Sequence, residues 1–264
     1  MSKRNMVDIS RDRGVSIMRL NNQRTRNSLC PDMRTSLAAA FRHAAEDKTV
    51  RVVYLTGAGG AFCSGGDLNA LRSQQSSWEV HQRFRQLGSW LLPFLQFEKP
   101  VVVGLNGYAV GGGIGLALAG DVLIAAKSAK LMSGFFRLGV IPDFGMMYTL
   151  PRLIGLARAK QFLFGNGTLS AEQALELGLV TEVVSNADLD EVCLKKAREF
   201  AEGPIRAMGL AKLIMARSFE TDLSDMFLLE GLGQALMQSG EEFSEGLNAL
   251  TAKRPARFQA QTED

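Results

Sequence analysis

Two glycine-rich turns are the segments of this sequence best suited to chemistry. The first, GAGGAFCSGGDL at residues 57–68, follows the apolar run 50–56, and the second, NGYAVGGG at 106–113, follows the apolar run 101–105. Each turn is expected to lead from a strand into a helix, where unpaired backbone N–H groups and the helix dipole favour an anion. Two such turns facing each other would hold one developing oxyanion, whereas a simple tight turn is the alternative for either one alone.

Neither turn matches two better-known glycine motifs. In a dinucleotide-binding fingerprint, the third required glycine after Gly57 and Gly59 would stand where Phe62 is found. A nucleophile elbow requires a glycine two residues before Ser64, and that position is again Phe62. The sequence therefore supports neither nicotinamide chemistry nor serine hydrolysis.

Histidine and cysteine usage excludes further classes. The chain has only two histidines, His43 and His81, which leaves too little material for a histidine-built metal centre or a Ser-His-Asp system. Its three cysteines, Cys30, Cys63 and Cys193, are an odd number without metal-ligand spacing. We interpret them as thiols and expect no metal site.

The elements that must position the turns follow a strand, turn, helix order. We expect strands at 14–20, 50–56, 100–105 and 122–126, and helices at 31–46 and 112–119, the former capped by Asn27 or Ser28. After residue 150 helical patterns dominate, through 159–164, 171–177, 189–201, 205–219 and 222–250. This order predicts an α/β core domain at 1–200 and a C-terminal helical oligomerisation subdomain at 201–264.

Composition limits location and partners. The chain of 264 residues is 46% hydrophobic, enough for one substantial core, and its apolar runs are too short to span a bilayer. A net charge of +3, from 30 basic and 27 acidic residues, is spread without a dense basic block. We expect a cytoplasmic protein that binds neither membrane nor nucleic acid, and the modest positive charge suits a small polyanionic ligand.

Five motifs, in order and spacing, resemble the crotonase (enoyl-CoA hydratase/isomerase) family over nearly the whole chain. They are AFCSGGDL at 61–68, the segment 99–113 beginning with Lys99-Pro100, LGVIPD at 138–143, LPRLIG at 150–155 and LSAEQALELGLV at 169–180. The resemblance implies a spiral of repeated ββα turns, a C-terminal helical trimerisation region and a coenzyme A thioester substrate. It implies a homotrimer, or a hexamer built as a dimer of trimers, and no cofactor besides the coenzyme A of the substrate.

The resemblance also assigns site residues. The family's oxyanion donors correspond to the backbone N–H groups of Gly66 and Gly112, which would stabilise an enolate formed next to the thioester carbonyl. The family's CoA-contacting segment corresponds to 21–29, where Arg24 or Arg26 would meet a phosphate, although surface arginines are commonly just solvated. The remaining predicted substrate-binding residues are Ser64, Asp67, Leu68 and Phe135. Asp67 has the alternative role of capping the helix that follows it.

The two glutamates that hydratases of the family use for water addition are absent. Their positions correspond to Gly115 and Phe135. One acid remains at a suggestive place: Asp143, in the run IPDFG. This arrangement resembles the subgroup containing 1,2-epoxyphenylacetyl-CoA isomerase and some Δ3,Δ2-enoyl-CoA isomerases, in which an aspartate at this motif is the acid/base.

A single carboxylate suffices for isomerisation, because it can take a proton from one carbon and return it to another two atoms away. Nearby apolar side chains, Phe135, Phe136, Phe144 and Met146, would raise the pKa of Asp143 and exclude water. The structural alternative is that Asp143 only caps the helix beginning near Phe144.

The sequence thus predicts an acyl-CoA isomerase with Asp143 as acid/base and Gly66 and Gly112 as oxyanion donors. The alternatives are a hydratase-like or other crotonase reaction with an unidentified base, and a non-catalytic relative that binds acyl-CoA or RNA. The absence of a lysine-rich helix argues against RNA.

Overall fold

A six-stranded sheet forms the centre of the molecule. The computed structural model describes residues 5–72 and 76–259. The strand order is β1-β2-β3-β5-β7-β10, with β1 and β2 antiparallel and every other neighbouring pair parallel. The strands are β1 Val7–Asp12, β2 Val15–Leu20, β3 Val52–Gly57, β5 Val101–Leu105, β7 Val122–Ala126 and β10 Glu182–Val184. The completely buried β3 and β5 are near-continuous apolar runs, as expected of parallel strands covered on both faces.

A second, smaller sheet has the order β4-β6-β8-β9. Its strands are β4 Ala61–Cys63, β6 Tyr108–Val110, β8 Lys130–Met132 and β9 Thr168–Ser170. Strand β3 of the first sheet leads directly into β4, β5 into β6, and β7 into β8, so the chain repeatedly crosses from one sheet to the other. Helices α2 Leu68–Arg72 and α4 Gly112–Leu118 follow the first two of these crossings. This repetition produces the α/β spiral of ββα turns that the sequence predicts.

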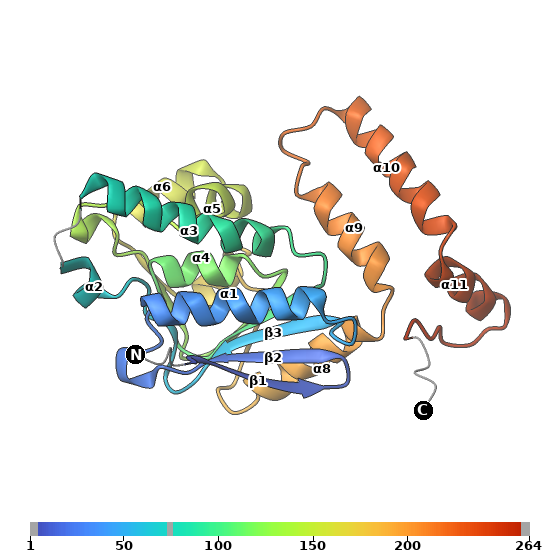
Figure 1. Cartoon of the computed structure of the whole chain (residues 1–264), viewed down its shortest axis with the longest axis horizontal. Helices are drawn as coiled ribbons and strands as arrows, with labels where there is room; N and C mark the ends of the chain where they lie inside the picture. Colours follow the sequence, from blue (N-terminus) through green and yellow to red (C-terminus); the bar gives the residue numbers. More distant parts are fainter. Residues whose placement is uncertain (1–4, 73–75, 260–264) are drawn as a thin grey trace.

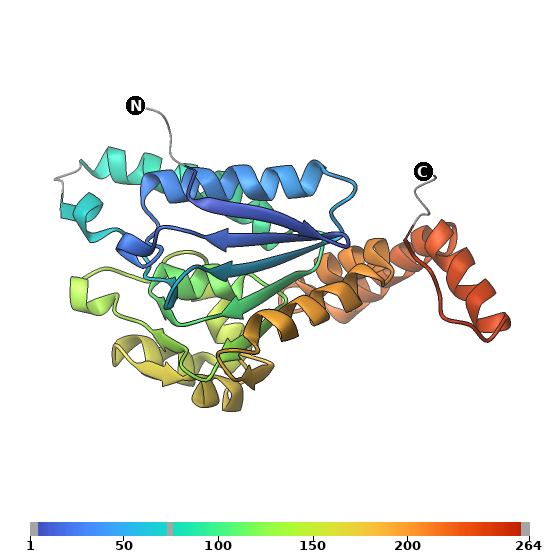
Figure 2. The same ribbon diagram turned by 90° about the horizontal axis from the view of Figure 1, so that it is seen from below.

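Helices cover both faces of the six-stranded sheet. Helix α1 Pro31–Glu46 and helix α3 Ser77–Leu95 lie on one side, and α8 Leu189–Ala201 lies on the other (Figures 1 and 2). The larger hydrophobic cluster contains the buried side chains of α1, α3 and α4, whereas α8 packs on the opposite face through Leu189 and Cys193. The remaining core elements are η1 Gln23–Thr25, η2 Phe136–Leu138, α5 Met146–Ile154, α6 Leu156–Phe164 and α7 Ala171–Glu176.

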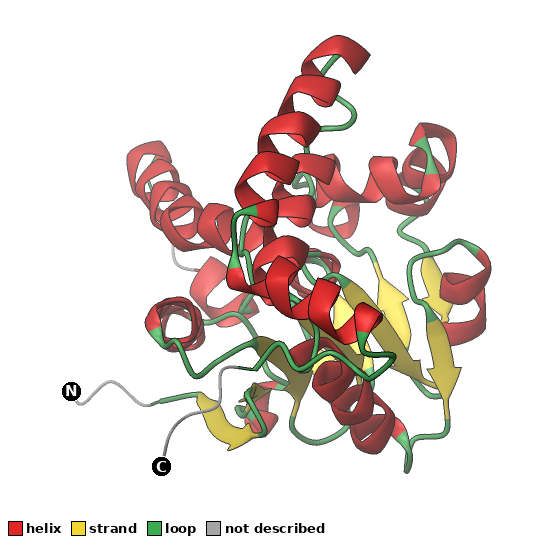
Figure 3. Ribbon diagram, turned by 90° about the vertical axis from the view of Figure 1, so that its right-hand side faces the viewer, coloured by secondary structure: helices red, strands yellow, loops and turns green. Residues whose placement is uncertain are grey.

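Three C-terminal helices form an arm that extends away from this core. They are α9 Ile205–Met215, α10 Leu223–Gln238 and α11 Glu241–Thr251 (Figures 1 and 3). The predicted domain boundary between residues 200 and 201 falls at the end of α8, one loop before the arm, and residues 260–264 of the predicted subdomain lie outside the described residues. The Lys212 ammonium donates to Asp121 Oδ2 at 2.7 Å, which ties α9 to the core.

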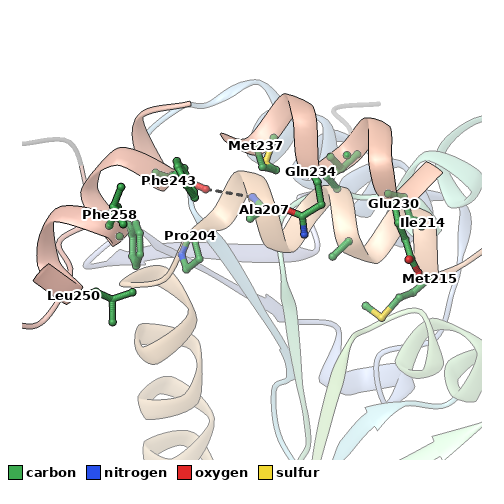
Figure 4. A pocket seen from close by; sticks show the side chains of 16 residues that line it. Pro204, Ala207, Ile214, Met215, Glu230, Gln234, Met237, Phe243, Leu250 and Phe258 are labelled. Carbon is green, nitrogen blue, oxygen red and sulfur yellow. Dashed lines mark hydrogen bonds between the residues drawn. The ribbon is translucent and has the colours of Figure 1, made fainter. Parts of the chain in front are cut away.

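The arm carries much apolar surface that its own chain leaves open. Helix α10 has no buried residue, although Phe227, Leu228, Leu232 and Leu236 lie along it. A cleft of about 610 Å³ runs between α9, α10 and α11, and Figure 4 shows Ile214, Met237 and Phe243 converging on it. Its polar contacts are few, one being the Ala207 N–H donating to Glu242 Oε2 at 3.2 Å.

The structure differs from the local predictions in two respects. Helix α1 is capped by Cys30, not by Asn27 or Ser28, because the buried Asn27 amide donates to the carbonyls of Ala58 and Ala61 at 3.0 and 2.9 Å. The strands β1, β4, β6, β8, β9 and β10 were not predicted, since β1 is mostly exposed and the others have only 3 residues each. For Asn27, β9 and β10 a contact distant in sequence decides the local structure, whereas β1 pairs with the adjacent β2 in a hairpin.

Candidate active site

The two glycine turns meet where β4 and β6 end. These strands pair in parallel, so the segments that follow them emerge at the same edge of the small sheet. Gly65 adopts φ of +78°, and a Cβ built on it would lie 2.4 Å from the Val110 carbonyl oxygen and 3.5 Å from the Gly112 nitrogen. Only glycine allows both this conformation and this approach. The backbone around Gly66 therefore lies against the start of α4.

The amides of Gly66 and Gly112 lie in these adjoining segments. Gly112 is the first residue of α4, so its N–H has no acceptor within the helix. Among the described residues, neither amide donates a hydrogen bond to the protein. Two unpaired N–H donors on adjoining segments are the groups from which an oxyanion hole is built.

Asp143 is held by an unusual turn before α5. Phe144 and Gly145 both have positive φ, +52° and +72°, and Gly145 is the N-cap of the helix. The Asp143 main-chain carbonyl accepts from the Met146 N–H at 3.0 Å, but the Asp143 side chain makes no capping bond. The alternative that Asp143 is the helix cap is therefore wrong. A non-glycine residue with positive φ, such as Phe144, is strained and commonly marks a functional constraint.

The carboxyl group of Asp143 lies directly over the start of α4. A Cβ built on Gly112 would be 3.2 Å from Asp143 Oδ1 and 2.9 Å from the Phe144 ring. Oδ1 is buried and has no hydrogen-bond partner among the described residues. Burial raises the pKa of Asp143, and the charges of Arg83 and Arg34 oppose that rise. The side chain is thus a buried acid with an unused oxygen beside an unpaired amide.

A cavity of about 120 Å³ contains this group. Its charged walls are Asp67 and Asp143 together with two arginines, Arg34 from α1 and Arg83 from α3. The other lining residues are Leu29, Pro31, Gly66, Ala70, Phe84, Leu87, Gly112 and Phe144. The predicted residues Gly66, Asp67, Gly112 and Asp143 are therefore brought together.

The two arginines were not predicted from the sequence, although each carried a signal. Arg34 precedes the buried Leu37 by three residues on α1, and Arg83 precedes the buried Leu87 by four residues on α3. Residues at these spacings share one helix face, so both guanidinium groups stand on faces that turn toward the core. A charge on such a face needs a partner or a function.

Other predicted binding residues do not line this cavity. The Ser64 hydroxyl donates to the Thr25 carbonyl at 2.8 Å, which fastens the 25–29 segment beside the first turn. Arg26 lines a separate pocket of about 330 Å³, and Arg24 is exposed on η1. The Leu68 side chain is 55% exposed at the start of α2. These positions stay predictions.

Comparison with known proteins identifies the family. Residues 10–261 match the family model described as enoyl-CoA hydratase/isomerase. The chain belongs to this family. It is 36% identical over 252 residues to 1,2-epoxyphenylacetyl-CoA isomerase of Escherichia coli strain K12, covering 94% of this chain and 95% of the relative. It is also 34% identical over 245 residues to a probable enoyl-CoA hydratase of Rhodobacter capsulatus, covering 93% and 94%.

Solved structures of the family share the fold. A crystal structure of an enoyl-CoA hydratase/isomerase from Cupriavidus metallidurans CH34 matches with a TM-score of 0.92 and 30% identity, covering 97% of both chains. The predicted crotonase family membership and α/β spiral fold are thereby confirmed. Within residues 5–72 and 76–259, no helix combines the length and apolar character needed to cross a bilayer.

The structure explains why one hydratase glutamate position is empty. A Cβ built on Gly115 would lie 2.6 Å from both Cβ and the carbonyl oxygen of Phe144. The turn that holds Asp143 thus occupies the space a side chain at residue 115 would need. The second position, Phe135, is buried and packs near Gly111, outside the cavity, so it does not surround Asp143 as predicted. Neither does Phe136, which contacts Phe164 instead.

Proposed function

We propose that this enzyme is an acyl-CoA isomerase that moves a double bond, or rearranges an epoxide, in an enoyl-CoA-type thioester. Asp143 is the acid/base, and the amides of Gly66 and Gly112 hold the thioester oxygen. The epoxyphenylacetyl-CoA isomerase among the relatives supports this reaction type. The proposed chemistry needs no cofactor besides the coenzyme A of the substrate.

The steps balance with one carboxylate. For a 3-enoyl-CoA, ionised Asp143 takes a proton from C2, and the electron pair of that C–H bond moves to form an enolate whose negative oxygen lies between the two amides. Protonated Asp143 then gives the proton to C4. The double bond now lies between C2 and C3, and Asp143 is ionised again.

One observation carries the proposal: the buried, unpartnered Asp143 Oδ1 lies against Gly112 while Gly115 has no room for a second acid. A base must reach the carbon adjacent to the carbonyl whose oxygen the amides hold. Asp143 occupies the corresponding position next to Gly112. Its burial favours the neutral form that must exist midway through the reaction.

The test is Asp143→Asn, which preserves shape and removes the base. We expect isomerisation of 3-hexenoyl-CoA, and turnover of 1,2-epoxyphenylacetyl-CoA, to fall by roughly 100-fold to 10,000-fold. The control is Asp225→Asn, at an exposed position on the arm, which should retain wild-type rates. Full turnover by Asp143→Asn would show that the base has been assigned wrongly.

Hydration is the second candidate. Asp67 lines the same cavity as Asp143, so two carboxylates are available to activate water and supply a proton. The hydratase relative supports it as well. Water addition to crotonyl-CoA faster than isomerisation of 3-hexenoyl-CoA would favour this reaction, and loss of hydration in Asp67→Asn would assign the second acid. No turnover on either substrate, with CoA binding retained, would indicate a non-catalytic relative.

The coenzyme A moiety and the oligomer complete the proposal. Arg24 and Arg26 would meet its phosphates, and Ser64, Leu68 and Phe135 would shape the path to the cavity. The open apolar face of α10 and the cleft beside it would pack on other copies of the chain in a homotrimer, or in a hexamer of paired trimers. The mass of the protein in solution tests this assembly.

A further inference from the structure

Two guanidinium groups share the small cavity with Asp143. Arg34 comes from α1 and Arg83 from α3, and both are partly buried. Burial lowers the pKa of Arg34, the nearby Arg83 lowers it further, and Asp143 and Asp67 oppose this. Arg34 therefore interacts with Arg83 and with both acids, and Arg83 interacts with Asp143, so the four groups form one electrostatic unit.

The charges that face Asp143 can be assigned to each surrounding element. Helix α1 contributes Arg34, α3 contributes Arg83, and the segment before α2 contributes Asp67. Helix α4 contributes only the backbone of Gly112, and the turn after Asp143 contributes the Phe144 ring. With both acids ionised, the charged side chains that line the cavity sum to zero.

We propose that Arg83, supported by Arg34, is a positioning residue that keeps Asp143 ionised in the resting enzyme and thereby sets the acidic limit of its activity. The inference rests on the proposed function, since it concerns the same base. Arg83 has the larger effect of the two arginines on Asp143.

The physical argument is a balance of two opposing effects. Burial of the Asp143 carboxyl group, with Oδ1 lacking a hydrogen-bond partner among the described residues, favours the protonated form, in which it cannot act as a base. Positive charge in the wall of the same cavity favours the ionised form and restores the base. During the reaction the negative charge moves from Asp143 to the thioester oxygen, so it stays within reach of the same arginines. The two arginines can therefore oppose the effect of burial on the pKa of Asp143 and still stabilise the negative charge after it has moved to the thioester oxygen.

The sign of the expected effect follows from this balance. Removing the positive charge of Arg83 raises the pKa of Asp143, because burial is then less opposed. A larger fraction of the enzyme is protonated at mildly acidic pH and inactive there. At alkaline pH Asp143 is ionised with or without Arg83, so activity returns.

The experiment measures kcat/KM for 3-hexenoyl-CoA against pH in Arg83→Gln and Arg83→Lys. We expect Arg83→Gln to lose about tenfold on the acidic side and less than about twofold on the alkaline side. Arg83→Lys keeps the charge and should keep the profile. Arg85→Gln is the matched control, at an exposed position on the same helix. An equal loss at every pH in Arg83→Gln would overturn the inference.

A direct titration separates this inference from the proposed function. In protein labelled with [4-13C]aspartate, the Asp143 resonance is assigned by its absence in Asp143→Asn, and its titration is followed without substrate. We expect its midpoint to move upward in Arg83→Gln and to stay in Arg85→Gln. An unmoved midpoint removes the role of Arg83 alone, whereas full isomerase activity of Asp143→Asn removes the proposed function.

Discussion

The cavity around Asp143 and the cleft of the arm differ in both size and chemistry. The arm cleft measures about 610 Å³ and is lined mainly by apolar side chains, whereas the cavity measures about 120 Å³ and has two acids and two arginines in its wall. Volume alone would favour the arm cleft as the functional site. Buried charges and unpaired amides indicate the smaller space, because such groups are costly unless a partner or a reaction uses them.

The two regions also differ in what fixes their shape. Around the cavity other parts of the chain pack closely against the backbone of Gly65, Gly112 and Gly115, where an added Cβ would meet neighbouring atoms at 2.4, 2.9 and 2.6 Å. In the arm, Gly231 has nothing within 4 Å of an added Cβ. The cavity is therefore enclosed by close contacts within this chain, whereas the space beside Gly231 is open in the single chain. The same substitution should have opposite effects in the two places.

The largest expected effect is that of Gly112→Ala. The new methyl group would push against Asp143 Oδ1 and the Phe144 ring, displacing the base and the neighbouring amide. We expect kcat for 3-hexenoyl-CoA to fall by roughly 100-fold or more, comparable to the loss of one oxyanion donor. Steady-state kinetics, with circular dichroism to verify folding, measure it. A folded variant with normal kcat would show that the contact at Gly112 is unimportant.

A smaller effect is expected in the arm, for Phe227→Glu on α10. Its side chain is 67% exposed in the single chain, and we expect another copy to cover it. Losing that burial and adding a charge should weaken assembly by about 2 to 3 kcal/mol, roughly 30-fold to 150-fold in the dissociation constant. Light scattering over a dilution series measures it. Ser224→Glu adds the same charge without removing apolar surface, and an equal response of both variants would count against an interface at Phe227.

The smallest expected effect is that of Gly231→Ala, also on α10. Alanine is favoured over glycine within a helix, and the new methyl group meets no atom of this chain. We expect the free energy of unfolding to rise by about 0.5 to 1 kcal/mol, measured by urea denaturation at fixed protein concentration. Marked destabilisation would instead show that a partner backbone approaches Gly231 closely in the assembly.

The sequence predicted the parts of the site that lie in continuous motifs. Gly66, Gly112 and Asp143 each stand in a continuous motif that resembles the crotonase family, so the resemblance could assign them before the fold was known. Arg34 and Arg83 stand on helices far from these motifs in sequence, and only the packing of α1 and α3 brings them to Asp143. The positions of Arg34 and Arg83 on core-facing helix faces indicated that each charge needs a partner, but they did not indicate that the partner is Asp143.

Polar side chains engaged at long range were the hardest to predict. Asp121 lies just after α4 in the sequence, and its Oδ2 accepts from the Val101 N–H and from Lys212, both at 2.7 Å. Asn27 resembled a helix cap and instead bonds two carbonyls of the first turn. Propensity describes what such residues do locally, and here tertiary contacts offered a better use.

The contact between Phe144 and Gly115 limits which acids this backbone can carry. This backbone cannot hold both the turn that positions Asp143 and a glutamate at residue 115 of α4. Phe144 in the turn and a side chain at residue 115 would occupy the same space. A single substitution of Gly115 by a larger residue would create a steric clash with Phe144, and a single substitution of Phe144 by a smaller residue would leave a cavity. Replacing the aspartate arrangement by a glutamate at residue 115 would therefore require a new backbone path for the turn as well as new side chains.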